Sequence, residues 1–361
     1  IDNLPKNIKP FVILPSATDL YDYFQVRQIP TYIVRVCFSA YPSIQNGLDI
    51  LLCPLRIVYR LLINLLAIIF IIRLVKQNKI DIIHTNTSVL HVGFWAAKIC
   101  HIHHIWHIRE YGDIGLNLTF FPTNCLHKKM LRQSNCIAIT QDLIRHNELN
   151  KSNKQIALIY DGVISKDQIQ VPQWRQTYVL YVGRLEPMKG IDNLISAYAQ
   201  YVQNEAQPLP LWIVGYTGNK EYENFLCQRV REFHLESYVT FLGKREDVLQ
   251  LMHQATVVVV PSECEGFGFI TAEAMSQGTL VIAKDLAGTK EQLDNGVNYT
   301  GHEIALRYHS QDELIAYLHA ITSHEPIFYK PIIDKALQTI EHFYTIENSN
   351  KQVYTFYQKI L

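Results

Sequence analysis

The sequence lacks the features that mark disulfide-rich, disordered and nucleic-acid-binding proteins. Gly and Pro are only 16 and 14 of 361 residues, which excludes a low-complexity chain. The 33 basic residues balance 33 acidic ones without a Lys/Arg-rich run, so no nucleic acid is expected as a partner. No C-x-x-C pair occurs, and the odd, scattered set of cysteines is typical of free thiols in a reducing cytosol: Cys37, Cys53, Cys100, Cys125, Cys136, Cys227 and Cys264.

Long apolar runs are also scarce. The longest, Leu61–Ile72, has 12 residues between two arginines, fewer than the roughly 20 needed to cross a bilayer. The run is apolar nearly all round, which indicates either a helix buried in the core or one lying on a membrane surface, and both alternatives stay open. The chain begins at Ile1 in a segment without the basic, apolar and small-residue regions of a signal peptide.

What the sequence does contain is a high hydrophobic content, 48%, over a length that predicts two domains with separate cores. Short β-branched runs alternate with longer helical patterns, which predicts parallel sheets covered on both faces. The first series of expected strands lies at 10–14, 31–37, 81–84, 103–108, 136–140 and 155–160. The second lies at 178–183, 211–215, 238–243, 256–262 and 280–283. An α/β fold with two doubly wound domains is therefore expected.

Composition also suggests where the domains meet. The polar stretch 165–177 contains a proline and no sustained hydrophobic period, which predicts a linker between a domain at 1–164 and another at 178–329. Residues 330–361 are helical in pattern, and we expect them to pack across the interdomain region. Their aromatic side chains need an apolar surface to cover: Phe343, Tyr344, Tyr354, Phe356 and Tyr357.

Two groups of polar residues follow strands of the second series, at the strand ends where doubly wound domains bind ligands. Arg184 and Lys189 in GRLEPMKG precede a helical pattern, and two cations beside a helix N-terminus suit a phosphate. Glu265 and Glu273 flank the turn Gly266-Phe267-Gly268, and carboxylates accept hydrogen bonds from vicinal sugar hydroxyls. The plainer alternative for each group is a set of solvated side chains.

With these motifs the chain resembles the family-4 retaining glycosyltransferases over nearly its whole length. The second half of that family is matched by GRLEPMKGIDNLISA, LWIVG, VTFLG and PSECEGFGFITAEAMSQGTLVIAKDLAGTKEQLDNG, which contain the E-x7-E signature as Glu265 and Glu273. The first half is matched more loosely, by DIIHTNTS, WHIRE, CIAIT and IALIYDGV. The resemblance implies a GT-B fold, in which two Rossmann-like domains face each other across a cleft and the C-terminal one binds most of the nucleotide-sugar.

The resemblance also implies roles for these residues. Arg184 and Lys189 would bind the donor diphosphate, Glu265 the donor sugar and Glu273 the ribose hydroxyls. Backbone at Gly183 and around Gly266, Phe267 and Gly268 would contact the donor. Configuration would be retained without an enzyme nucleophile, so the two glutamates would not act as the carboxylate pair of a glycosidase.

In the first domain the resemblance places His107 beside the donor sugar, as a fourth catalytic residue with Glu265, Arg184 and Lys189. Thr85, Asn86 and Glu110 are candidates for the acceptor side, because each lies just beyond an expected strand. The neighbouring histidines His101, His103 and His104 suggest a metal site, but no Asp, Glu or Cys arrangement completes a ligand set and none is expected. No cofactor is expected besides the nucleotide-sugar substrate.

The chain also departs from the family pattern. Only nine residues precede the first expected strand, so about 25 to 30 residues, one βα unit, are expected to be missing. The leading hypothesis is a cytoplasmic, membrane-peripheral retaining glycosyltransferase that moves a sugar to a glycan or lipid-linked acceptor in polysaccharide or glycolipid biosynthesis. The alternatives are a catalytically silent nucleotide-sugar-binding subunit or truncated remnant, and a sugar-nucleotide epimerase.

Overall fold

The computed structural model describes residues 8–42, 44, 47–114 and 118–361, and it divides into two compact units. Unit 1 holds the described residues up to Ile159 together with Asn350–Leu361, and unit 2 is Tyr160–Ser349. Both units contain parallel strands connected by helices, so the predicted α/β class is confirmed. The expectation that one βα unit is missing before the first strand concerns the amino terminus, where residues 1–7 lie outside the described residues.

Unit 2 is built on a six-stranded sheet in which all neighbouring strands are parallel, in the order β12-β11-β10-β7-β8-β9. The chain order reverses between β7 and β10, and such a switch point is where doubly wound sheets bind ligands. The strands are β7 (Val179–Val182), β8 (Leu211–Val214), β9 (Val239–Gly243), β10 (Val257–Val260), β11 (Leu280–Lys284) and β12 (Leu306–Tyr308).

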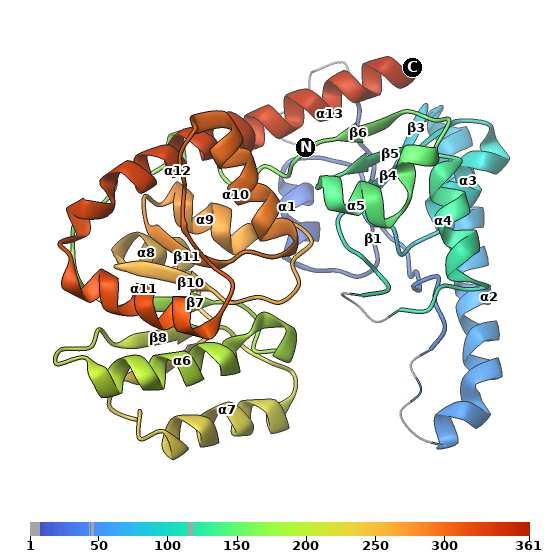
Figure 1. The fold of residues 1–361 in the computed structure, drawn as a ribbon. Coiled ribbons are helices and arrows are strands. Elements are labelled where there is room, and N and C mark those ends of the chain that lie inside the picture. The colour runs from blue at the N-terminus through green and yellow to red at the C-terminus, as the bar shows by residue number, and fades with distance from the viewer. Residues whose placement is uncertain (1–7, 43, 45–46, 115–117) are drawn as a thin grey trace. The chain divides into compact units, whose positions relative to one another are not determined.

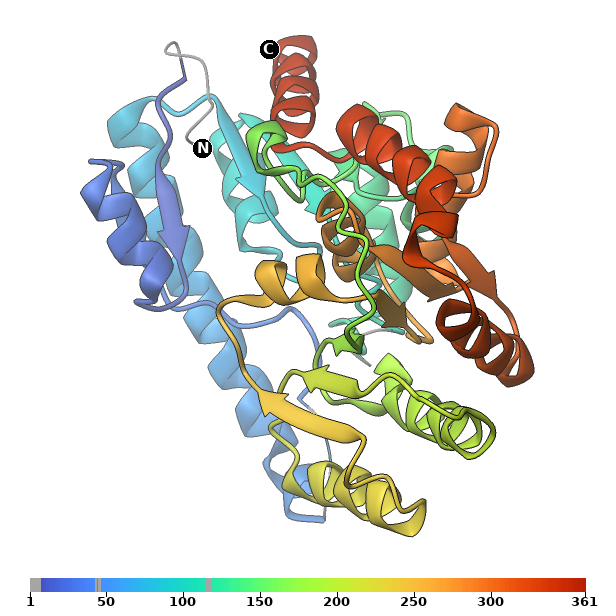
Figure 2. The ribbon, with the colours of Figure 1, turned by 90° about the vertical axis from the view of Figure 1, so that its left-hand side faces the viewer.

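Helices cover both faces of this sheet (Figure 2). Contacts between helices fall into two groups, with α6 touching α7 and α11 in one, and α9 touching α8 and α12 in the other. All four side chains of β10 are buried, as a central strand between two helical layers requires. The helices are α6 (Ile191–Asn204), α7 (Lys220–Glu232), α8 (Val248–Gln254), α9 (Phe269–Ser276), α10 (Ala287–Thr300), α11 (Gln311–Ser323) and α12 (Lys330–Phe343), with short 3-10 turns η2 (Lys166–Gln168), η3 (Pro187–Lys189) and η4 (Pro326–Tyr329).

Unit 1 contains two separate parallel sheets. One pairs β1 (Val12–Leu14) with β2 (Thr31–Ile33), and the other has the order β3-β4-β5-β6. The four strands of the second sheet are β3 (Ile82–Thr85), β4 (His103–Ile108), β5 (Asn135–Ala138) and β6 (Ile156–Leu158). The helices are α1 (Asp19–Val26), α2 (Gly47–Asn78), α3 (Val92–Cys100), α4 (Asn124–Arg132) and α5 (Gln141–His146), with the 3-10 turn η1 (Leu149–Lys151).

The apolar run of the sequence analysis is part of α2, a single helix of 32 residues. Within Leu61–Ile72 only Ala67 and Ile71 are buried, so the alternative of a core helix is wrong for most of the run. In Figure 1 the first half of α2 extends beyond the other elements of its unit. The uninterrupted apolar run alone is too short to cross a bilayer, but the whole helix is much longer than this run. By length and composition, α2 is able to cross a membrane.

The C-terminal residues form the predicted helices, α12 and α13 (Ile346–Ile360). α12 packs on α9 and α10 of unit 2. From Asn350 onward the chain belongs to unit 1, where Phe356 and Ile360 pack against Ile105 and Ile137. The last part of α13 therefore completes the core beneath the β3–β6 sheet.

The units change between Ile159 and Tyr160, before the stretch 165–177 that composition suggested as a linker. That stretch is bound to unit 2: Gln170 N donates to Ser276 O at 2.9 Å, and Gln173 Nε2 lies 2.6 Å from His253 Nε2. All eleven predicted strands are present, with shifted ends. The twelfth, β12, was missed because its three residues lack a β-branched run.

Candidate functional site

The candidate site lies at the switch point of unit 2, where the segments that follow β7 and β10 meet. Gly190 directly precedes α6 with φ +67°, and a Cβ there would come within 2.1 Å of Pro261 O. Only glycine therefore allows the turn after β7 to approach the end of β10 this closely. The backbone of Glu263 also donates to Met188 O at 2.9 Å, so the two segments are joined directly.

The segment between β10 and α9, residues 261–268, is held by further bonds. Gly288 N donates to Glu265 O at 3.0 Å, and Gln292 Nε2 donates to Phe267 O at 2.8 Å. Lys284 Nζ lies 2.5 Å from Glu263 Oε1. Because several elements hold its backbone, the positions of its polar groups are set before any ligand binds.

Lys189 and Glu265, predicted to lie in one site, are in direct contact. Lys189 Nζ lies 2.7 Å from Glu265 Oε1, and the two side chains are 19% and 16% exposed. The geometry places one cation and one anion side by side at the carboxyl edge of the sheet. An incoming anion would compete with Glu265 for Lys189.

Arg184, the second predicted phosphate ligand, lies in the same turn but makes a different contact. Its guanidinium NH1 is 2.7 Å from Glu186 Oε1, and the side chain is 57% exposed. The backbone of Arg184 is fixed, because Tyr181 OH donates to Arg184 O at 3.0 Å. Arg184 and Lys189 therefore lie in the same loop, and each is paired with a different glutamate.

Glu273 is the fifth residue of α9, just over one turn into the helix as the spacing predicted. Burial raises the pKa of its carboxyl above the ordinary value. Within the described ranges, no hydrogen bond or ion pair to this carboxylate is present. A half-buried carboxylate of this kind is suited to accept hydrogen bonds from hydroxyl groups of a ligand.

The residues between the two glutamates contribute backbone and packing. Gly268 precedes α9 with φ +92°, and a Cβ there would touch Thr289 Oγ1 at 3.0 Å. Phe267 is buried among Tyr160, Phe269 and Tyr344, so only its backbone can reach a ligand. The first N–H groups of α9 have no acceptor within the helix, as at every helix start, and they favour an anion.

In unit 1, His107 belongs to β4 and is buried. His107 Nδ1 lies 3.2 Å from His84 Nε2, and His84 Nδ1 lies 2.5 Å from Tyr357 OH. The three side chains form a chain of hydrogen bonds from α13 to β4. His84 and Tyr357 were not predicted as functional residues.

The direction of these hydrogen bonds follows from their chemistry. Burial raises the pKa of Tyr357 to about 12, so the phenol keeps its proton at neutral pH. Burial and, less strongly, the Arg109 guanidinium lower the pKa of His84 to about 4, so His84 is neutral. A phenol is a better donor than an imidazole N–H, which favours Tyr357 OH donating to Nδ1 of His84. His84 then donates through Nε2, and neutral His107, whose pKa burial also lowers, carries its proton on Nε2.

The candidates for the acceptor side are engaged in bonds within unit 1. Thr85 Oγ1 lies 2.9 Å from His104 Nε2. Asn86 is exposed, and its Oδ1 accepts from Arg109 Nε at 3.0 Å. Glu110 Oε1 accepts from the Ser88 backbone and hydroxyl, both at 2.7 Å. Asn86 is therefore the one of the three with an exposed side chain, while Glu110 holds the loop after β3.

The other histidines are divided between two places. His101 directly follows α3 with φ +56° and is not part of β4, whereas His103 and His104 belong to β4, where His104 packs on Trp106. In the part of the chain that the structure describes, no group of three His, Cys, Asp or Glu side chains could hold a metal ion. The expectation of metal independence stays a prediction.

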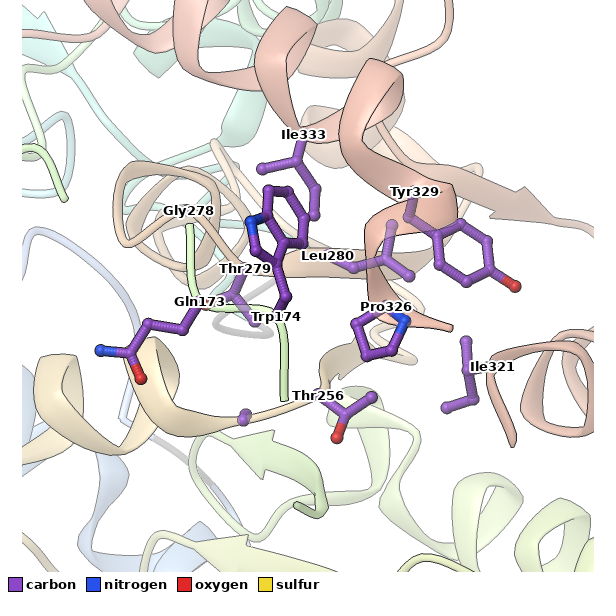
Figure 3. A pocket seen from close by; sticks show the side chains of 11 residues that line it. Gln173, Trp174, Thr256, Gly278, Thr279, Leu280, Ile321, Pro326, Tyr329 and Ile333 are labelled. Carbon is purple, nitrogen blue, oxygen red and sulfur yellow. The ribbon is translucent and has the colours of Figure 1, made fainter. Parts of the chain in front are cut away.

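A small cavity in unit 2 lies away from this site. It is lined by Thr256 just before β10, by Leu280 at the start of β11, and by Trp174, Tyr329 and Ile333 (Figure 3). These are the amino ends of the strands, the edge opposite to the polar groups described above. The cavity is therefore not part of the candidate site.

Comparisons with known proteins support the fold. The solved structure of Anabaena Alr3699/HepE in complex with UDP is 21% identical, covers 97% of this chain and 92% of that one, and gives a TM-score of 0.73. Likeness at this level shows the fold alone, and the expectation of a GT-B fold is confirmed.

Curated relatives match parts of the chain. An uncharacterized glycosyltransferase of Methanocaldococcus jannaschii is 27% identical over 61% of this chain and 62% of its own length. The N-acetyl-alpha-D-glucosaminyl L-malate synthase of Bacillus anthracis is 25% identical over 46% of this chain and 45% of its own length. The chain thus spans less than two thirds of the length of these relatives.

The family match covers the unit that holds the candidate site. Residues 165–358, more than half of the chain, match the glycosyl transferases group 1 family. The segments after β7 and β10 both lie inside this range. The chain belongs to the glycosyl transferases group 1 family.

Proposed function

We propose that the chain is a retaining glycosyltransferase of family 4, which moves a sugar from a nucleotide-sugar to a glycan or lipid-linked acceptor in polysaccharide or glycolipid biosynthesis. The observation that carries the proposal is the Lys189–Glu265 pair, at 2.7 Å, beside the start of α9 at the switch point. A cation, a carboxylate and a helix N-terminus in one place suit a diphosphate joined to a sugar. Membership of the family supports the same activity.

Each predicted ligand has a role in this proposal. Lys189 and Arg184 bind the diphosphate. To do so, Arg184 leaves its ion pair with Glu186, and Lys189 leaves its ion pair with Glu265. The released Glu265 carboxylate accepts hydrogen bonds from the donor sugar. Glu273 accepts them from the ribose, whose two neighbouring hydroxyls match its two oxygens. Backbone N–H groups at Gly183 and around Gly266 to Gly268 complete the donor site.

The chemistry that these groups provide is stabilisation of charge. As the glycosidic bond breaks, the nucleoside diphosphate gains negative charge and the sugar becomes positively charged. Lys189, Arg184 and the start of α9 stabilise the leaving group, which helps to deprotonate the acceptor on the same face of the sugar. Retention then requires no enzyme nucleophile, and the proposed reaction uses no metal ion or cofactor.

In unit 1 the proposal assigns His107 a hydrogen bond to a sugar oxygen. The bonds from Tyr357 through His84 support this role, because they favour a proton on His107 Nε2. Thr85, Asn86 and Glu110 remain proposed acceptor-side residues. The cytoplasmic location expected from the free cysteines stays a prediction.

The test starts with purified full chain and UDP, the nucleotide present in the solved Anabaena structure. We expect calorimetry to show UDP binding. With UDP-sugars and a panel of glycan and lipid-linked acceptors, we expect transfer with retained anomeric configuration by NMR. Lys189→Ala and Glu265→Ala are each expected to lower transfer at least about 100-fold.

Other outcomes separate the alternatives. A cooperatively folded protein that gives no heat with any nucleotide or nucleotide-sugar would indicate a silent subunit. Conversion of a nucleotide-sugar without acceptor would indicate an epimerase. Unchanged turnover in both alanine variants would disprove the assigned site.

A further inference from the structure

Around its middle, the helix α2 turns polar side chains toward the protein, while its outer side is apolar. On the side that faces the protein, Arg60 NH1 donates to Ala40 O at 2.8 Å, and Asn64 Nδ2 donates to Cys37 O at 3.1 Å. A helix in contact with water on its outside normally places such residues outward and its leucines inward. The environment of the outer side of α2 is therefore unlike water.

The outer side is apolar over about six turns. At 3.6 residues per turn, its exposed large side chains cover about half of the circumference of the helix. Leu51, Leu55 and Leu66 are 76%, 68% and 63% exposed. The whole set is Leu48, Ile50, Leu51, Leu55, Val58, Tyr59, Leu61, Leu62, Leu65, Leu66 and Ile69.

Basic residues border this apolar surface. Arg73 and Lys76 are exposed and follow Ile69 at i+4 and i+7, so they continue the same side of the helix. At the other margin, the Arg35 guanidinium lies 5.8 Å from the centre of the Tyr59 ring. Leucines flanked by Arg and Lys complement an anionic headgroup layer above acyl chains.

The contacts of α2 favour a helix that lies in the membrane surface over one that crosses it. In its second half, Ala67, Ile71 and Val75 pack against α3. Near its middle, Arg60 and Asn64 bond to backbone of the segment 37–40. A spanning orientation would take these polar groups into the hydrocarbon and break the packing on α3.

The width of the apolar surface also argues against a second copy of the chain as its partner. Two helices that pair in a coiled coil cover a seam of two positions in seven. On α2 that seam would leave most of the leucines outside the contact. A lipid layer covers the whole exposed half of the circumference at once.

From these observations we propose that the outer side of α2 inserts into the surface of an anionic lipid bilayer, with its axis in the membrane plane and Arg73 and Lys76 at the level of the lipid phosphates. This inference stands independently of the proposed transfer reaction, because it concerns unit 1 alone. A membrane-bound chain would meet lipid-linked acceptors by diffusion in two dimensions.

The test is flotation of the purified full chain with vesicles of phosphatidylcholine, with and without phosphatidylglycerol. We expect binding to the anionic vesicles that weakens at high salt. The triple variant Leu62→Gln, Leu65→Gln, Leu66→Gln should lower the partition coefficient about 100-fold or more. Arg73→Gln with Lys76→Gln should lower it about 10- to 30-fold on anionic vesicles only.

A matched control removes exposed apolar side chains elsewhere. Val171 and Phe328 of unit 2 are 80% and 61% exposed, and Val171→Gln with Phe328→Gln should float like the original protein. Circular dichroism melting establishes that all variants are folded. Extraction of the loaded vesicles at alkaline pH should release the chain.

Four results would overturn the proposal. The first is a chain that stays with the lipid at alkaline pH, because such a chain has a spanning helix. The second is a triple variant that floats like the original protein, and the third is a chain that does not float with anionic vesicles. The fourth is a dimer, seen by sedimentation, that the triple variant abolishes. None of them bears on nucleotide binding by unit 2, so transfer and membrane binding can fail separately.

Discussion

If Glu265 occupies the place of a phosphate on Lys189, then Glu265→Gln should bind free UDP more tightly than the original protein while transferring sugar more slowly. Lys189 Nζ contacts Glu265 Oε1 at 2.7 Å, so a diphosphate must displace this carboxylate. The neutral amide of Gln competes less strongly for the ammonium group. Lys189→Met, by contrast, should weaken both UDP binding and transfer.

The size of the effect follows from the geometry of the pair. At 2.7 Å and an effective dielectric constant of about 20, the Coulomb attraction is about 6 kcal/mol before desolvation is counted. Since the side chains keep 19% and 16% exposure, we expect a net coupling of about 1 to 3 kcal/mol. Release of about half of it to an incoming phosphate tightens UDP binding about 2- to 13-fold.

The assay is titration calorimetry with UDP on the original protein, both single variants and the double variant. The matched control is Glu263→Gln, which breaks the neighbouring Lys284–Glu263 pair at 2.5 Å in the same segment. UDP affinity in this control should change less than twofold. Urea unfolding of the same four proteins gives the coupling free energy of the pair.

One pattern would refute the reasoning. If Glu265→Gln weakens UDP binding as much as Lys189→Met while the coupling free energy stays near zero, Glu265 does not compete with the diphosphate. Lys189 would then bind its ligand without releasing its partner.

Three further predictions concern titration and the histidines. Glu273→Gln should lower donor affinity about tenfold at pH 7.5. Burial raises the pKa of Glu273, so its carboxylate is protonated at a higher pH than that of an exposed glutamate. Calorimetry across pH should therefore show that the original protein begins to lose donor affinity at that higher pH. Burial lowers the pKa of His91 to about 4, so below about pH 6.5 the unfolded chain takes up a proton at His91 and the folded chain does not. His91 therefore contributes a loss of stability of about 2 kcal/mol between pH 7 and 5, in addition to the losses from other buried histidines such as His84 and His107. Urea unfolding of His91→Gln should show a loss smaller by about this amount, whereas His302→Gln at an exposed position should keep the full loss. Tyr357→Phe should lower kcat about fivefold with little change in KM, and it should shift the ring ¹⁵N signals of His84. His84→Gln should retain most activity, because Nε2 of the new side chain can still donate a hydrogen bond to His107. Unchanged ring signals in Tyr357→Phe would disprove the hydrogen-bond direction.

Much of the fold could be predicted because it depends on local pattern. Successive side chains of a strand point to opposite faces, so the four consecutive valines Val257–Val260 are all buried only in a strand between two helical layers. They form β10. Glu273 was placed correctly because a glycine turn followed by a helical pattern fixes the helix start. In contrast, β12 has three residues of mixed character, and its strand pairing with β11 depends on the rest of the sheet.

The parts that escaped prediction depend on contacts far apart in the chain. Tyr357 reaches His84 across 273 positions. The sequence analysis expected the C-terminal helices to pack across the interdomain region, but no local pattern indicates which side chain of unit 1 Tyr357 meets. The only local hint was the place of His84 near the carboxyl end of an expected strand. For α2, an apolar run has the same appearance whether its outer side meets protein or lipid, so exposure had to come from the structure.

The Lys189–Glu265 pair has a consequence for the whole of unit 2. A half-buried lysine without a partner would cost free energy in the unliganded protein, because its charge would be partly removed from water. Glu265 offsets that cost at 2.7 Å, and the bonds of its segment to Met188 and Gly288 hold it there. In the proposed reaction, a diphosphate that replaces the carboxylate would take the counter-ion of Glu265 when sugar hydroxyls become available to it. The proposal therefore makes the stability of the empty site and the binding of both parts of the donor depend on the same two side chains.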